Sequence, residues 1–168
     1  MHKSVIAVVF LSACAWAQNP VSDALRNQLT RMEKNTIGAA EEMPADKYGY
    51  KPTEAQVAFG HWVSHATRAN YLICSELTGG TAPEAAAKDT DPKDKLIEAL
   101  KKSFDYCSAQ LPKLQDSQLG EEVLLFGSRK TTKGAAVLEL SADWADHYSQ
   151  MASYLRLNGL LPPTAKKN

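Results

Sequence analysis

The stretch TKGAAVLELSADWADHYSQMASYLRLN, residues 132–158, decides the fold class. Its apolar residues recur at intervals of three and four, which is the spacing of one face of an α-helix. They form one stripe: Val137, Leu140, Trp144, Met151 and Leu155. Gly159 and the pair Pro162-Pro163 end the pattern, since glycine suits a helix C-cap and proline cannot continue a helix. We therefore predict one long helix across the whole stretch.

Three earlier stretches have the same spacing and predict helices at about 21–42, 53–77 and 93–114. The second is expected to open at Thr53, because Thr53-Glu54-Ala55-Gln56 fits the capping-box pattern. Gly79-Gly80 should end it. In the third, Pro112 predicts a bend or an early end.

Four long helices in 168 residues predict an all-α fold, a four-helix bundle with long second and third connections. The chain is long enough for one domain with a proper core, which we place at residues 20–163. Between the third and fourth helices the pattern breaks, and Val123-Leu124-Leu125-Phe126 is interpreted as a short extended piece laid across the bundle. Lys plus Arg and Asp plus Glu both number 19, so no basic field is available and a nucleic-acid partner is disfavoured.

The first 17 residues are typical of a signal peptide, with a short polar start and an apolar run from Val5 to Ala13. That run is short for a membrane-spanning helix. Two kinds of processing stay open. Ala15-Trp16-Ala17 is an A-x-A site that would free Gln18, whereas Leu11-Ser12-Ala13-Cys14 resembles a lipobox that would leave a lipidated Cys14. The chain is thus expected to be exported, periplasmic or extracellular, and membrane-associated only if Cys14 carries lipid.

Export would leave Cys74 and Cys107 in an oxidising compartment. Each lies on a predicted helix, so a disulfide between neighbouring helices and two buried free thiols remain equal alternatives. Reactive-thiol chemistry is disfavoured, since neither cysteine has a C-x-x-C partner or an activating basic cluster.

Asp143 and His147 lie four residues apart at the edge of the apolar stripe, so both project from one face of the fourth helix. His65 lies near the inner face of the second helix, with His61 one turn earlier. Imidazole and carboxylate groups suit Zn, Ni, Fe or Mn, and three protein ligands leave a position for water or substrate. The other interpretation is a set of core or rim histidines, with Asp143 and His147 as an ordinary i,i+4 surface pair.

The sequence also resembles the DinB/YfiT-like family of metal-dependent helical-bundle proteins. The resemblance rests on AEEMPADKY at 40–48, KPT at 51–53, Phe59-Gly60, His65, ANY at 69–71, WADHY at 144–148 and YLRLNG at 154–159, and it covers nearly the whole chain after residue 17.

The resemblance implies a divalent metal held by His65 and His147, the family's ligands on the second and fourth helices. Asp143 stands where the family usually has a histidine. Aspartate can still ligate, so the implied site is His65, Asp143 and His147, with a changed affinity or metal preference. His61 is a substitute ligand that the family pattern does not include.

The function implied is a metal-dependent hydrolase or transferase acting on a small molecule, with no assigned catalytic residue. The family includes thiol-dependent transferases, but an exported protein would have little cytosolic thiol at hand. The alternative is a non-catalytic binding or structural domain of the cell envelope, with no metal. A homodimer is compatible with either interpretation.

Overall fold

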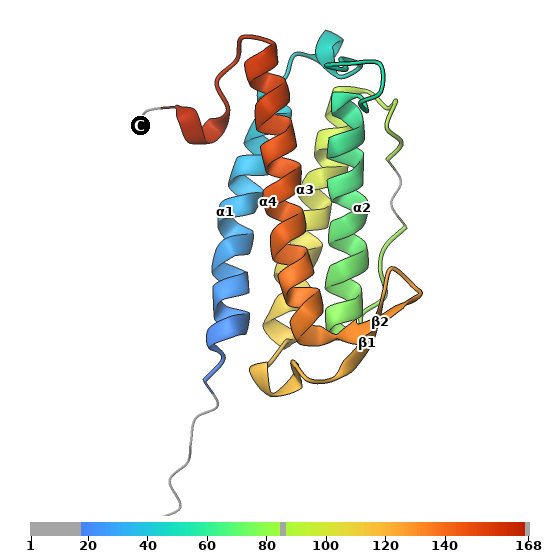
Figure 1. Ribbon diagram of the computed structural model, residues 1–168, viewed down its shortest axis with the longest axis vertical. Helices are drawn as coiled ribbons and strands as arrows, with labels where there is room; N and C mark the ends of the chain where they lie inside the picture. The colour runs from blue at the N-terminus through green and yellow to red at the C-terminus, as the bar shows by residue number, and fades with distance from the viewer. Residues whose placement is uncertain (1–17, 85–86, 167–168) are drawn as a thin grey trace, which may run out of the picture.

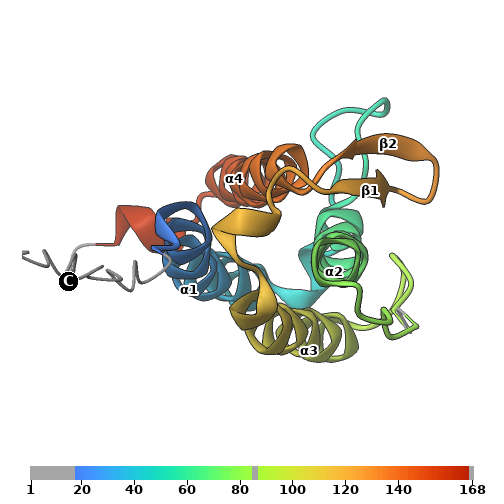
Figure 2. The same ribbon diagram turned by 90° about the horizontal axis from the view of Figure 1, so that it is seen from below.

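The computed structural model describes residues 18–84 and 87–166, so the predicted signal peptide lies outside the described residues. The described residues form four long helices. They lie side by side in Figure 1, and the end-on view in Figure 2 shows them in a square arrangement. They are α1 (Pro20–Glu42), α2 (Phe59–Thr78), α3 (Lys93–Gln110) and α4 (Lys133–Leu157). The predicted all-α bundle is confirmed. None of the described helices has the length and apolar character needed to cross a membrane.

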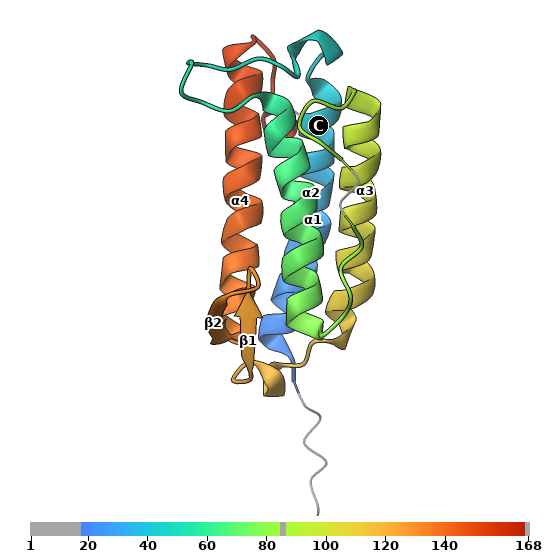
Figure 3. The same ribbon diagram turned by 90° about the vertical axis from the view of Figure 1, so that its right-hand side faces the viewer.

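The described parts of the connection between α2 and α3, residues 79–84 and 87–92, lie along the outside of the bundle, as Figure 3 shows. Helices α2 and α3 therefore run parallel, while α1 and α4 run opposite to them. This order places α2 between α3 and α4, as Figure 2 shows. Side chains of α2 therefore face two different partner helices.

The N-terminus of α1 is capped by a residue distant in sequence. Asp116, in the 3₁₀ turn η3 (Asp116–Gln118), accepts hydrogen bonds from the backbone N–H groups of Val21 and Ser22 at 2.9 and 2.8 Å. A carboxylate at a helix N-terminus satisfies free backbone donors and suits the helix dipole. The first helix is thereby fixed to the segment that precedes the hairpin.

The prediction that α2 begins at Thr53 is wrong, because the helix begins at Phe59. The Thr53 hydroxyl donates to the Gln56 side-chain carbonyl at 3.1 Å, so these residues make a local contact and no capping box. The first backbone donors of α2 are satisfied by carbonyl groups of the preceding segment. The N–H of Phe59 donates to Tyr50 at 3.1 Å, and that of Gly60 donates to Tyr48 at 2.9 Å.

The end of α3 and the segment after it differ from the prediction in detail. Helix α3 ends at Gln110 and a 3₁₀ turn, η2 (Leu111–Lys113), follows, which confirms the early end expected from Pro112. The extended piece expected at 123–126 is strand β1 (Glu122–Leu125), and it pairs antiparallel with β2 (Arg129–Thr132). The second strand was not predicted, since RKTT at 129–132 carries no apolar alternation.

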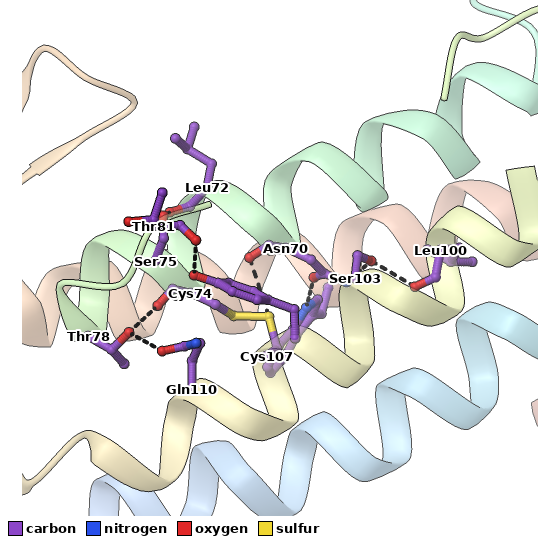
Figure 4. Close-up of a disulfide and its surroundings, with 12 residues drawn as sticks. Asn70, Leu72, Cys74, Ser75, Thr78, Thr81, Leu100, Ser103, Cys107 and Gln110 are labelled. Carbon is purple, nitrogen blue, oxygen red and sulfur yellow. Dashed lines mark hydrogen bonds between the residues drawn. A yellow bond between two sulfur atoms is a disulfide. The ribbon is translucent and has the colours of Figure 1, made fainter. Parts of the chain in front are cut away.

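A buried polar chain and a disulfide link α2 to its neighbours. The indole N–H of Trp144 donates to the Asn70 side-chain oxygen at 2.7 Å, and the Asn70 amide donates to the Ser103 hydroxyl at 3.0 Å. Figure 4 shows the disulfide between Cys74 of α2 and Cys107 of α3 next to the hydrogen bond between Asn70 and Ser103. Of the two alternatives left open for the cysteines, the structure has the disulfide.

Removing the disulfide should destabilise the bundle, because it closes a loop across a sequence separation of 33 residues. The chain-entropy relation for such a loop gives about 3 to 4 kcal/mol. We expect the double variant Cys74→Ala with Cys107→Ala to lose this much free energy of unfolding, measured by urea denaturation, and to melt roughly 10 °C lower. A reducing agent should lower the melting temperature of the parent protein and leave that of the variant unchanged. A loss below about 1 kcal/mol would contradict the expectation.

Candidate metal centre

Three of the predicted site residues meet between α2 and α4. His65, Asp143 and His147 each offer one ligand atom, and these atoms lie within 4.8 Å of one another. Ligand atoms around one ion lie roughly 3 to 3.5 Å apart when the bonds are about 2.1 Å long. The Nδ1 atom of His147 and a carboxylate oxygen of Asp143 already have this spacing, at 3.2 Å.

The contact between Asp143 and His147 is not an ordinary hydrogen bond. Both atoms are buried, and neither has a hydrogen-bond partner of acceptable geometry despite the 3.2 Å between them. Buried polar atoms are nearly always paired, so two adjacent unpaired atoms with lone pairs need an explanation. A cation between the two atoms would satisfy both. The fit of a metal therefore rests on this buried pair of atoms without hydrogen-bond partners.

The electrostatics of the pair favour a neutral state in the absence of a cation. Burial, with the neighbouring carboxylates of Glu139 and Asp146, raises the pKa of Asp143 from 3.8 to about 7. Burial, with His65 nearby, lowers the pKa of His147 to about 4. Burial also lowers the pKa of His65, with smaller effects from neighbouring cationic groups. At neutral pH both imidazoles therefore keep lone pairs available for a metal.

His61 is not part of the group, since among the described residues only His65, Asp143 and His147 bring ligand atoms together. The Nδ1 of His61 lies 2.7 Å from a carboxylate oxygen of Asp89, in the connection between α2 and α3. Its ring stacks on His65, with the centroids 5.4 Å apart. The structure thus gives His61 a carboxylate partner of its own, whereas the sequence left it open as a substitute ligand.

Sequence reasoning missed Asp89. Burial opposes its ionisation, but hydrogen bonds from Ser64 and His61 together lower the pKa of Asp89 to about 2. Arg68 contributes a further ion pair at 3.3 Å. The connection can approach α2 here because residue 60 is glycine, since a Cβ at Gly60 would lie 2.6 Å from the Asp89 carbonyl oxygen. In the sequence, Gly60 was the one sign that another segment lies close to α2 at this point.

Sequence reasoning also missed Trp62, which belongs to the same surroundings. Its ring lies 5.8 Å from that of His147 between centroids, and its indole nitrogen is buried without a hydrogen-bond partner. Nothing in the pattern distinguishes a packing tryptophan from one whose N–H is available.

The fold and these side chains define a four-helix-bundle protein whose second and fourth helices bring histidine and aspartate side chains together. The sequence profile of the DinB superfamily matches residues 28–151, so the chain belongs to that superfamily. This confirms the family resemblance drawn from the sequence. A search of curated proteins found no match.

Solved structures support the same fold. A DinB-like protein from Bacillus subtilis aligns over 86% of this chain and 99% of its own, with a TM-score of 0.68 and 24% identity. A DinB-like protein from Bacillus cereus aligns over 84% and 95%, with a TM-score of 0.70 and 16% identity. A mutant of the mycothiol-dependent maleylpyruvate isomerase aligns over 77% of this chain and 60% of its own, with a TM-score of 0.63 and 13% identity.

Divalent-metal affinity should fall as the pH is lowered below about 7, because a metal must displace the proton of Asp143, whose pKa is raised to about 7. The sign follows because a proton and the metal compete for the same carboxylate, and the raised pKa sets the pH at which the loss begins. Competition with one proton predicts about a tenfold loss of affinity per pH unit between pH 7 and 5. Zinc titrations at three pH values, by calorimetry, measure it.

The matched control is Asp143→Asn, which removes the titrating carboxyl. This variant should bind zinc more weakly at pH 7.5 and show a much flatter pH profile, because the low pKa of His147 keeps that ring neutral over the same range. Equal slopes for the two proteins would contradict the assignment of the proton to Asp143.

Proposed function

We propose that this chain is a divalent-metal-dependent enzyme of hydrolase or transferase type, with His65, Asp143 and His147 as the metal ligands. The observation that carries the proposal is the buried, unpaired juxtaposition of Asp143 and His147 beside His65. Zinc, nickel, iron and manganese all accept imidazole and carboxylate ligands, so the metal is proposed only by class. Membership of the DinB superfamily supports it.

The side chains divide the work of such a site. A bound divalent ion with an open position lowers the pKa of a coordinated water or thiol and so supplies a nucleophile near neutral pH. His147, with a side chain only 4% exposed, holds the inner side of the site, whereas Asp143 is 20% exposed and lies toward its opening. Reactants therefore approach past Asp143 and His65.

A cavity of about 590 Å³ lies beside His61. Its walls come from the segment before α2 and from the connection that carries Asp89, and none of the three proposed ligands lines it. His61 lines this cavity and its ring stacks on that of His65, so His61 contacts both the cavity and a proposed ligand. A volume of this size suits a small molecule. We propose that the non-reacting part of the substrate occupies it.

We further propose that the protein acts outside the cytoplasm, as the N-terminal sequence indicates, with lipid attachment at Cys14 as the alternative to release. The partner is proposed to be a small molecule, and balanced charge gives no support to a nucleic acid. A homodimer remains a prediction. A mycothiol-dependent isomerase shares the fold, but at 13% identity this likeness does not select a thiol reaction for this chain.

Metal uptake tests the proposal directly. The protein, loaded with each of the four metals and desalted, should retain about one equivalent of at least one of them by mass spectrometry, and His147→Ala should retain less than about a tenth, because it loses an inner ligand. His61→Ala is the matched control, and its affinity should stay within about threefold of the parent. His61 lies on α2, as His65 does, and its ring contacts that of His65, but its Nδ1 pairs with Asp89.

The competing function is a non-catalytic envelope domain in which the same polar group only joins α2 to α4. It predicts no retained metal in the parent protein, and a chelator would then change neither melting temperature nor any measured activity. Retention of metal by His147→Ala at the parent level would also reject the ligand set.

A further inference from the structure

The indole N–H of Trp62 is an unused hydrogen-bond donor beside the proposed metal site. Four buried side-chain atoms lack a partner among the described residues, and three of them belong to Trp62, Asp143 and His147. The Trp62 ring lies 5.8 Å from the His147 ring between centroids. Three of the four unpaired atoms thus belong to side chains where α2 meets α4, and a ligand bound there would satisfy them.

The three atoms differ in what they can bind. Asp143 and His147 present lone pairs, which a cation satisfies. An indole N–H can only donate, so it needs an acceptor atom, and a cation cannot supply one. One metal ion thus leaves Trp62 unsatisfied, and the missing acceptor must belong to something else in the site.

The positions along α2 place Trp62 on the flank opposite His61. At 100° per residue, His61 and Trp62 lie on either side of His65 on the helix surface. His61 faces Asp89 and the 590 Å³ cavity, whereas Trp62 faces α4 through His147. Trp62 therefore contacts the metal-ligand group from the flank of α2 that faces α4.

We propose that Trp62 donates its indole N–H to an oxygen atom of the ligand that completes the metal's coordination, and so positions oxygen ligands such as carboxylates in preference to thiols. Sulfur is a weak hydrogen-bond acceptor, whereas an ionised oxygen makes short, strong hydrogen bonds. The inference rests on the proposed metal-dependent function. It deepens that function by naming a substrate class, one that presents a carboxylate or carbonyl oxygen to the metal.

Acetate binding to the cobalt-loaded full chain tests the proposal, with the visible absorption of Co²⁺ as the readout. We expect Trp62→Phe to take up cobalt like the parent protein and to bind acetate about tenfold more weakly, since one hydrogen bond to a charged oxygen is lost. Affinity for ethanethiol, the sulfur probe, should change less than about twofold. Equal acetate affinities in variant and parent would overturn the proposal. A loss of ethanethiol affinity as large as the loss of acetate affinity would also overturn it, because it would indicate lost packing.

Trp144→Phe is the matched control, because the Trp144 N–H is already committed to Asn70. This variant should be less stable but should bind acetate with the parent affinity. If the parent protein takes up no metal, both the function and this inference fail. If it takes up metal but acetate affinity does not depend on Trp62, only the inference fails.

A second measurement needs no variant at position 62 to fold. The full chain has three tryptophans, so ¹⁵N-labelled protein gives up to three indole N–H signals, and Trp144→Phe removes one of them. In zinc-loaded protein, acetate should shift one of the remaining signals downfield, and it should shift none after zinc is removed. The absence of any such shift in zinc-loaded, acetate-saturated protein would overturn the proposal.

Discussion

The attachment of α2 to both of its neighbours is the constraint on which the rest of the structure depends. The disulfide from Cys74 holds one face of this helix against α3, and the hydrogen bond between Asn70 and Trp144 holds another face against α4. These two contacts leave α2 little freedom to rotate about its own axis. Trp144 directly follows Asp143 on α4, so the packing of α4 against α2 that buries Trp144 in the core also brings Asp143 close to His65. The site therefore depends on how these two helices pack and not on the Trp144 hydrogen bond alone.

The helices were predictable because their apolar periodicity is a local property, and each was found close to its true position. The start of α2 was not predictable, because its first donors are satisfied by carbonyl groups of Tyr48 and Tyr50, a contact that no local capping pattern encodes. The grouping of His65, Asp143 and His147 was predicted from spacing on two helices together with the family resemblance. Asp89 and the free N–H of Trp62 escaped detection, since their roles depend on how a connection folds back and on which hydrogen bonds remain unmade.

Asp143 gives the site a chemistry different from that of a three-histidine set. A third imidazole would leave the ligand group neutral, whereas an ionised carboxylate adds one negative charge and offsets part of the charge of a divalent ion. The nearby carboxylates of Glu139 and Asp146 oppose that ionisation when no cation is present. The metal site thus disfavours an anion on its own and favours an anion whose charge is balanced by a bound metal cation.

The parallel course of α2 and α3 requires the long external connection at 79–92, and the disulfide between Cys74 and Cys107 encloses that whole connection. A protease that cuts the connection would therefore leave two fragments joined covalently. The first fragment would carry His65, and the second would carry Asp143 and His147. Such a nicked molecule would keep all three side chains in one assembly for as long as the disulfide stays oxidised.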